Sequence, residues 1–390
     1  MGATPGVNAR RNGGSAGLWA VVSRAAFLAC SWTWVIGMYL PVILCREFGW
    51  PGWAAFAVPN VVGAAGMGLA LRRRGASDQM LEGHWRAGSL FSAATIAFQA
   101  FFITWVFNFT FGDWLGRYAG VAGAGVMAAI GLGLSRLGSR AWGAAGVAAW
   151  LLSVGLLVMA WLTGPGQYAA PAPSGLSAWT GLLFVAPVCV FGFALCPYLD
   201  LTFHRVRRET PGRAGDAAFV LGFGGLFLVM IVATLLYAQG IISKGWWSFY
   251  LVGHMLLQTG FTVGAHVRER AALAPASGPR REVNALLTPL LVGVPAGLVP
   301  GTVLKPAYAA GETVYVVFMA LYGLAFPAYV WLVMGRRRRR ALTWWALAVG
   351  IASPMFWMGF VEREWWWLGP GLLVALAAKL PLLTRPKHAA

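Results

Sequence analysis

The sequence predicts an all-α, polytopic membrane protein with about twelve transmembrane helices. Two observations lead to this prediction. Of the 390 residues, 59% are hydrophobic and only 11% are charged. Apolar runs of about 20 residues recur along almost the whole chain, and each is long enough to cross a bilayer core about 30 Å thick. The predicted spans are 18–44, 51–71, 88–110, 116–134, 141–162, 178–203, 217–239, 246–266, 286–303, 313–335, 342–360 and 366–384.

Basic residues predict the orientation of these spans. The N-terminus and every second loop carry 23 of the 30 lysines and arginines, whereas the opposite loops carry five. This asymmetry follows the positive-inside rule, so we expect an inner-membrane protein with both termini in the cytoplasm. The net charge of +18, including the run "GRRRRR" at 335–340, then indicates contact with anionic lipid of the bilayer and not with nucleic acid.

The loops are too short for a soluble domain, so we expect one membrane domain in five parts. The Pro/Gly-rich stretch "TGPGQYAAPAPSGLSA" at 163–178 is typical of a linker. Five spans on each side of it make two repeats, and because five is odd, the second repeat is inverted. The parts are a cytoplasmic tail at 1–17, a first five-helix repeat at 18–162, an external linker at 163–177, a second repeat at 178–335, and two additional helices with a cytoplasmic tail at 336–390.

Glycine and proline interrupt the first helix of each predicted repeat. Gly37 and Pro41 lie in "SWTWVIGMYLPV" at 31–42, and Pro187 and Pro197 lie in the sixth span. Proline removes a backbone donor, and broken backbone inside a membrane needs protein or a water-filled cavity to satisfy it. Matched interrupted helices indicate a transporter's binding site. The alternative is that these prolines reflect only the general frequency of proline in membrane helices.

Two segments resemble a known superfamily. "SWTWVIGMYLPVILCREFGWPGWAAFAVPNVVGA" at 31–64 resembles the first two core helices of the amino acid–polyamine–cation transporters, in which the sodium–solute symporters and nucleobase permeases are nearest. "PYLDLTFHRVRRETPGRAGDAAFVLGF" at 197–223 resembles their junction of the sixth and seventh helices. The resemblance implies the leucine-transporter-like fold, which consists of two inverted five-helix repeats and two further helices.

We expect a solute site between the two interrupted helices. Aromatic groups without a buried carboxylate suit a small neutral or zwitterionic solute, whose carboxylate would meet the N-terminus of a half-helix. The predicted lining residues are Trp32, Thr33, Gly37, Met38 and Tyr39 of the first span, Gln99 of the third span, and Phe191, Gly192 and Phe193 of the sixth.

The eighth span carries a polar stripe at i, i+4 and i+8, formed by His254, Gln258 and Thr262. Such a stripe commonly forms helix–helix hydrogen bonds. The resemblance implies a second interpretation, in which the hydroxyls of Thr259 and Thr262 bind sodium together with carbonyls of the broken first helix, because these oxygens are hard ligands. A third hypothesis makes His254 a proton-coupling group.

Asp200 and His204 lie one turn apart near the cytoplasmic end of the sixth span. At that spacing their side chains can meet on one helix face. They are either a cytoplasmic gate or proton relay, or a pair that anchors the helix end beside Arg205.

These features predict a secondary active transporter that works by alternating access and is coupled to sodium or to protons. The alternative is a non-transporting membrane accessory, sensory or assembly protein on the same scaffold. An enzyme is not expected, because the sequence has no nucleophile elbow, paired-carboxylate motif or metal-ligand spacing. We expect no cofactor, and no metal other than sodium. Unwound segments at 37–41 and 187–197 facing a cavity would favour transport, whereas a packed centre would favour the alternative.

Overall fold

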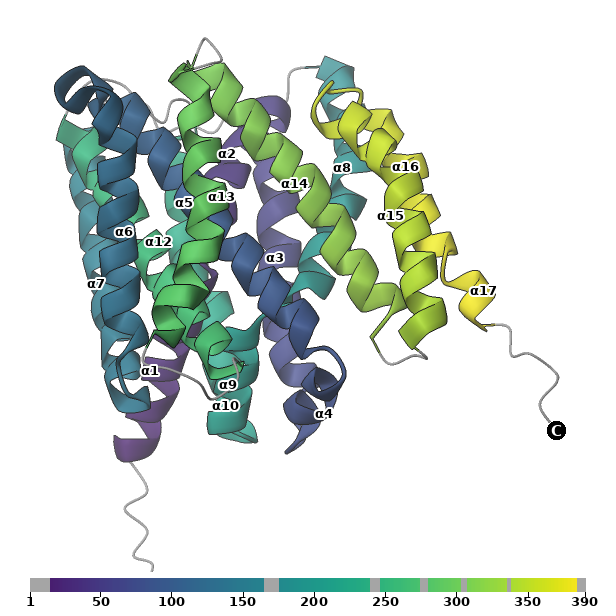
Figure 1. Ribbon diagram of the computed structural model, residues 1–390, viewed down its shortest axis with the longest axis horizontal. Coiled ribbons are helices and arrows are strands. Elements are labelled where there is room, and N and C mark those ends of the chain that lie inside the picture. Colours follow the sequence, from purple (N-terminus) through teal and green to yellow (C-terminus); the bar gives the residue numbers. More distant parts are fainter. Residues whose placement is uncertain are drawn as a thin grey trace, which may run out of the picture.

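The computed structural model describes residues 15–164, 175–238, 246–273, 280–302, 307–334 and 338–383. Over these ranges every regular element is a helix. The helices run side by side as one bundle, and α1, α4, α9 and α10 lie at its lower end (Figure 1). Most of the predicted linker falls outside the described residues, and α8 already begins within its predicted end, at Gly175.

The first half of the chain contains seven α-helices and one short 3-10 segment. They are α1 (Ser15–Trp32), α2 (Val35–Phe48), α3 (Trp50–Ala70), α4 (Ala76–Glu82), α5 (Trp85–Leu115), η1 (Gly116–Tyr118), α6 (Ala119–Ser135) and α7 (Ser139–Thr163).

The second half has a broken first helix and a π-helical insertion in its second. Its elements are α8 (Gly175–Leu195), η2 (Cys196–Leu199), α9 (Leu201–Glu209), α10 (Arg213–Leu221), η3 (Gly222–Phe227), α11 (Leu228–Val232), η4 (Ala233–Leu236), α12 (Trp246–Leu273), α13 (Arg281–Thr302) and α14 (Ala307–Leu332). The last elements are α15 (Arg338–Phe360), η5 (Trp365–Trp367), α16 (Leu368–Ala377) and α17 (Leu380–Leu383).

Each of the twelve predicted spans coincides with a described helix or helical run. Nine of these are long and apolar enough to cross a membrane, and the bent pair of α1 and α2 makes a tenth. The helix α6 is apolar but has only 17 residues, and α12 does not meet the same test of length and composition. The chain is therefore a multi-pass membrane protein with nine or ten candidate spans among the described residues.

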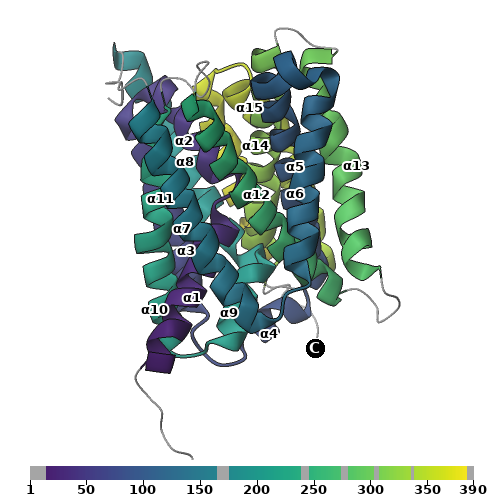
Figure 2. The same cartoon turned by 90° about the vertical axis from the view of Figure 1, so that its left-hand side faces the viewer.

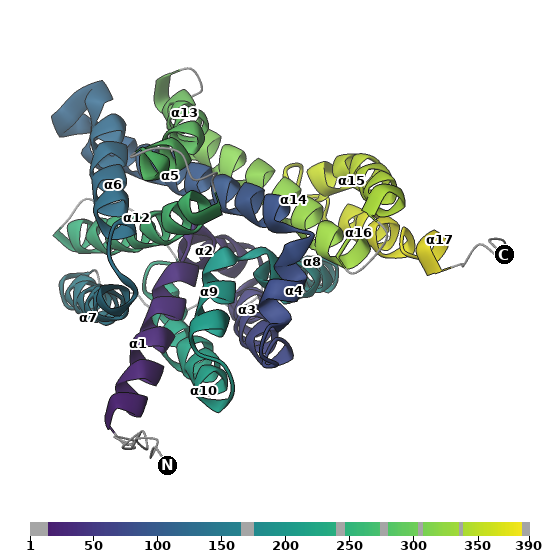
Figure 3. The same cartoon turned by 60° about the horizontal axis from the view of Figure 1, so that its bottom comes forward.

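Contacts between the halves follow a paired pattern. The first helix of each half packs on the second of the other, since α1 contacts α10 and η3 while α8 contacts α3. The third helix of each half packs on the fourth of the other, since α5 contacts α13 and α12 contacts α6. Figure 2 shows α10 and α11 on the opposite side of the bundle from α13. The helices α15–α17 stand at one edge (Figure 3).

The break in the first helix lies at Thr33 and Trp34, where α1 ends and α2 begins with a bend of 60°. The predicted break at Gly37 and Pro41 is wrong, because both residues lie inside α2. Pro41 lies in the interior of this helix, and a Cβ atom on Gly37 would meet the Phe227 ring at 3.5 Å, which is ordinary van der Waals contact. The hinge is therefore one turn earlier than the Gly/Pro pattern predicts.

Candidate functional site

One side chain at the first break and two from neighbouring helices bind backbone groups on its two sides. Thr262 of α12 donates a hydrogen bond to the Cys30 carbonyl at 3.2 Å, and the Trp34 indole donates to the Ser31 carbonyl at 2.5 Å. On the other side of the break, the Val35 N–H donates to Gln99 Oε1 of α5 at 3.3 Å. Protein groups therefore supply the partners that a break inside a membrane requires.

The second break centres on Asp200, which has extended backbone between η2 and α9. Its Oδ1 caps α9 by accepting from Thr202 N at 2.8 Å and from Thr202 Oγ1 at 2.6 Å. Thr202 Oγ1 also lies 3.3 Å from Ser31 Oγ, and the rings of Trp32 and Phe203 lie 4.9 Å apart. The two broken helices thus touch at their breaks.

A buried acid and a buried imidazole face each other beside this contact. Asp200 Oδ2 lies 3.9 Å from His266 Nε2 of α12, and both side chains are fully buried. Neither of these two atoms has a hydrogen-bond partner among the described residues. His266 Nδ1 lies 3.0 Å from Ser92 Oγ of α5. His266 is not among the predicted site residues, although it continues the stripe of His254, Gln258 and Thr262 by one further step of four residues.

Asp200 and His204 do not pair as predicted. The carboxylate of Asp200 turns back onto Thr202 as a helix cap, whereas His204 Nε2 lies 3.0 Å from the Tyr198 carbonyl, which the turn η2 brings within reach. Burial lowers the pKa of His204 to about 4, so its imidazole is neutral at physiological pH. A relay between these two side chains is not supported.

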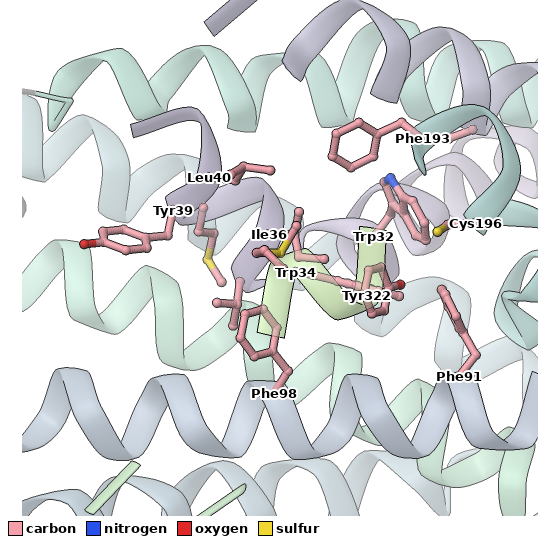
Figure 4. Close-up of a cluster of buried hydrophobic side chains, with 14 of the residues drawn as sticks. Trp32, Trp34, Ile36, Tyr39, Leu40, Phe91, Phe98, Phe193, Cys196 and Tyr322 are labelled. Atoms are coloured by element: carbon pink, nitrogen blue, oxygen red, sulfur yellow. The ribbon is translucent and has the colours of Figure 1, made fainter. Parts of the chain in front are cut away.

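The space between the breaks is filled by aromatic side chains (Figure 4). The Trp34 ring lies 5.2 Å from Phe91, 5.4 Å from His266 and 5.9 Å from Tyr322. A small apolar cavity of about 40 Å³ remains between α2, α8 and α14, which is close to the room of one water molecule. Its lining includes Leu40, Gly192, Phe193, Cys196 and Tyr322.

The nine predicted pocket residues do not surround one cavity. Gly192 and Phe193 line the small cavity, but Trp32 donates to Asn60 Oδ1 at 2.6 Å and Thr33 donates to the Ala29 carbonyl at 2.8 Å. The other five contact different parts of the protein. Gly37 lies beside Phe227, and the Met38 carbonyl accepts a hydrogen bond from Tyr237. Tyr39 donates to Glu312, Gln99 accepts from the first N–H of α2, and Phe191 is buried in the core.

The predicted polar stripe of the eighth span faces α1 and α7. Gln258 Nε2 donates to Ser153 Oγ of α7 at 2.6 Å, and Thr262 reaches α1 as described above. The Thr259 hydroxyl instead donates to the Met255 carbonyl of its own helix at 2.8 Å. His254 is buried on the same helix, and its Nδ1 has no hydrogen-bond partner among the described residues. Of the two predicted sodium ligands, Thr262 alone is placed beside the broken helix.

An ionic cluster joins α2 to α14 at the end of the bundle predicted to face outward. Glu312 of α14 accepts from Arg46 of α2, from Tyr39 Oη at 2.8 Å and from Arg363 at 3.3 Å. Arg363 precedes η5 and has a φ of 64°, the only positive φ of a non-glycine residue among those described. We call Tyr39, Arg46, Glu312 and Arg363 the outer cluster.

A second ionic cluster closes the opposite end. Arg24 of α1 pairs with Glu209 of α9 at 2.7 Å, and Arg205 of α9 pairs with Glu209 at 3.2 Å and with Glu269 of α12. We call these four residues the inner cluster. A cleft of about 840 Å³ opens beside it between α4, α9 and α12. Both ends are thus bridged by ion pairs, while the centre is packed.

The hydrogen bond from the Val35 N–H of α2 to Gln99 can be tested by substitution. Replacing Gln99 with methionine removes the acceptor of the Val35 N–H and leaves this donor unpaired in the core. We expect a loss of about 1–3 kcal/mol in stability, measured by thermal unfolding in detergent. Thr104→Val on the same helix is the matched control, because that hydroxyl donates to the Ala100 carbonyl of its own helix. Equal effects of both substitutions would contradict the capping role.

No family model matches the sequence, and no curated protein matches it. The structure is similar to two solved structures. One is the substrate-bound outward-open state of a Na⁺-coupled sialic acid symporter, with a TM-score of 0.47 and 14% identity over 96% of this chain and 91% of that chain. The other is MhsT in complex with L-phenylalanine, with a TM-score of 0.45 and 13% identity over 93% of this chain and 98% of that chain.

Proposed function

We propose that this protein is a secondary transporter that moves a small solute by alternating access. The observation that carries the proposal is the direct contact of two broken helices, through Ser31 and Thr202, inside one bundle. Interrupted helices at matching positions are where transporters bind their solutes. No enzymatic activity is proposed.

The paired contacts support an internal repeat. Each half begins with a long helix, a break and a shorter helix, and each of these broken helices packs on the second helix of the other half. The third helices, α5 and α12, pack on each other between the halves. We therefore propose two inverted five-helix repeats at 18–162 and 178–335, followed by two additional helices, in the leucine-transporter-like arrangement. The basic loops support an inner-membrane location with both termini in the cytoplasm.

The ionic clusters support alternating access. Such a mechanism requires that one end of the site opens while the other stays closed. The outer cluster joins α2 to α14, and the inner cluster joins α9 to α1 and α12, so each end can open by separating its own ion pairs. The described arrangement, with both clusters formed, corresponds to an occluded state of the transport cycle.

The nature of the solute follows from the polar groups at the breaks. The sequence-based premise that no carboxylate is buried there is wrong, because Asp200 is fully buried. This carboxylate does not line the apolar cavity between α2, α8 and α14, so a solute bound there meets no acidic partner. We propose a neutral or zwitterionic solute that takes the place of the aromatic packing around Trp34.

Sodium coupling is tested by ligand-dependent stability. Thr262 Oγ1 and the Cys30 carbonyl place two hard oxygen ligands together at the first break. We expect sodium to raise the unfolding temperature of the purified protein above that in choline at equal ionic strength, since a ligand at 100 times its Kd adds about 2.7 kcal/mol. Thr262→Val should abolish the rise, whereas Thr259→Val should keep it. Equal unfolding temperatures of wild type in sodium and in choline would contradict the sodium site.

A panel of small solutes in the same assay tests transport itself. A solute that raises the unfolding temperature is then supplied, in labelled form, to proteoliposomes containing the full chain, where uptake is the expected result.

The packed centre and the small cavity favour a second candidate, the non-transporting accessory or sensory protein. Absence of both a solute-dependent shift and uptake across the panel would support that second function.

A further inference from the structure

We propose that Asp200 and His266 form a proton-binding site that joins the second broken helix to α12. The two side chains come from different helices and are both fully buried. Their unbonded atoms, Oδ2 and Nε2, point at one another across 3.9 Å. Proton binding at this pair does not depend on the proposed transport function. Only a role of the pair in coupling proton binding to transport rests on the proposed function.

With Asp200 ionised and His266 neutral, the pair carries one negative charge in a fully buried place, which is costly. This holds for both tautomers of His266, whether Nδ1 donates to Ser92 Oγ or accepts from it across 3.0 Å. One proton taken from water removes the net charge of the pair, which then consists of an imidazolium facing a carboxylate or of a carboxyl group facing an imidazole. A hydrogen bond between the two side chains has a normal separation of about 2.8 Å.

The rest of the Asp200 carboxylate is held in place independently of this proton. Its Oδ1 accepts both bonds from Thr202 at the start of α9, so proton binding at Oδ2 leaves the helix cap intact. Closing the remaining gap therefore requires that α9 and α12 approach each other. Proton binding at the pair thus acts on the position of α9, the short helix that follows the second break.

Other groups around the pair set its electrostatic environment. On α12, the charge of Glu269 acts on Asp200 and that of Arg270 acts on His266. The helix α5 presents Ser92, α1 presents Ser31, and the first break presents Trp34, none of which titrates in the physiological range. On α9, His204 and Arg205 follow Asp200 in the chain. On α14, the charge of Tyr322 interacts with those of Asp200 and Cys196.

A path for the proton begins at the cleft between α4, α9 and α12. Leu201 and Glu269 both line this cleft of about 840 Å³. Leu201 directly follows Asp200 in the chain, and Glu269 lies one helical turn beyond His266. The proton is therefore exchanged with the α4–α9 end of the bundle, which the basic loops predict to be cytoplasmic.

The test counts protons bound by the detergent-purified full chain, between about pH 8 and pH 5. We expect Asp200→Asn to bind about one proton fewer than wild type, because it removes the carboxylate. His266→Gln keeps the buried carboxylate, so it should bind the proton with a midpoint shifted from that of wild type. His254→Gln should match wild type. It is the matched control, since His254 is buried on the same helix and, among the described residues, no charged group acts on it.

Infrared spectroscopy of the same samples gives a second readout. An acid-induced carboxyl band should be absent in Asp200→Asn and shifted in His266→Gln. If Asp200→Asn does not fold, His266→Gln decides the test. Proton counts and uptake midpoints that both equal those of wild type in the folded variants would overturn the site. A missing proton without solute uptake in proteoliposomes would keep the site and overturn only the transport function.

Discussion

Replacing Glu312 with alanine is expected to open the outer end of the bundle. The substitution removes the shared acceptor of Arg46, Arg363 and Tyr39 and so separates α2 from α14. Breaking a buried ion pair costs about 3–5 kcal/mol. We expect about 2–3 kcal/mol here, because the side chains of Arg46 and Arg363 are 39% and 32% exposed and water can solvate them after the change.

Thiol labelling measures this opening directly. All four cysteines are buried, and Cys189 and Cys196 line the cavity between α2, α8 and α14. A membrane-impermeant maleimide should therefore label wild type slowly and Glu312→Ala quickly. The control is Glu362→Ala, because Glu362 lies near the same end and accepts from the exposed Trp357 indole. Equal labelling rates in the two variants would show that the outer cluster does not close this end.

The second large effect is expected at the contact of α3 with α8. A Cβ atom on Gly63 would overlap the carbonyl group of Phe193 and the Cα atom of Ala194, and this backbone cannot move aside as a side chain would. Gly63→Ala should therefore cost about 3 kcal/mol or more, at the upper end of the range for overpacked cores. The substitution also pushes apart the first helix of one half and the second helix of the other.

Gly66, one turn later on α3, provides the control. A Cβ atom there meets nothing within 4 Å, so Gly66→Ala should leave stability unchanged or raise it slightly through higher helix propensity. Both variants are compared by thermal unfolding in detergent. Similar unfolding temperatures for the two variants would mean that α3 and α8 can separate without a large loss of stability. The close approach at Gly63 would then not require glycine.

The helices themselves are predictable from the sequence because membrane helices form largely from local apolar runs. Each predicted span coincides with a helix or helical run, and the two broken helices belong to the predicted first and sixth spans. The exact place of the first break is not local. Thr262, Gln99 and Trp34 satisfy its backbone groups from three different segments, and a proline within α2 gives no information about them.

The candidate site was harder to predict for the same reason. Asp200 and His204 lie at helical spacing, but Asp200 is the N-cap of α9 and has extended backbone, so its carboxylate accepts from Thr202 and does not lie along the helix face with His204. The partner of Asp200 is 66 positions away on α12. The periodic stripe on that helix does extend to His266, and this is the one local signal that indicated it.

The two ends of the bundle differ in how they are held closed. The inner cluster is built from α1, α9 and α12, which all belong to the proposed repeats. The outer cluster includes Arg363, which lies between α15 and η5, outside both repeats. The helices of the two proposed repeats pack in a symmetric way, but the ion pairs at the two ends of the bundle do not follow that symmetry. The segment of the two added helices contributes to the outer cluster alone, so changes in that segment, or in lipid packed against it, would alter one half of the proposed transport cycle and spare the other.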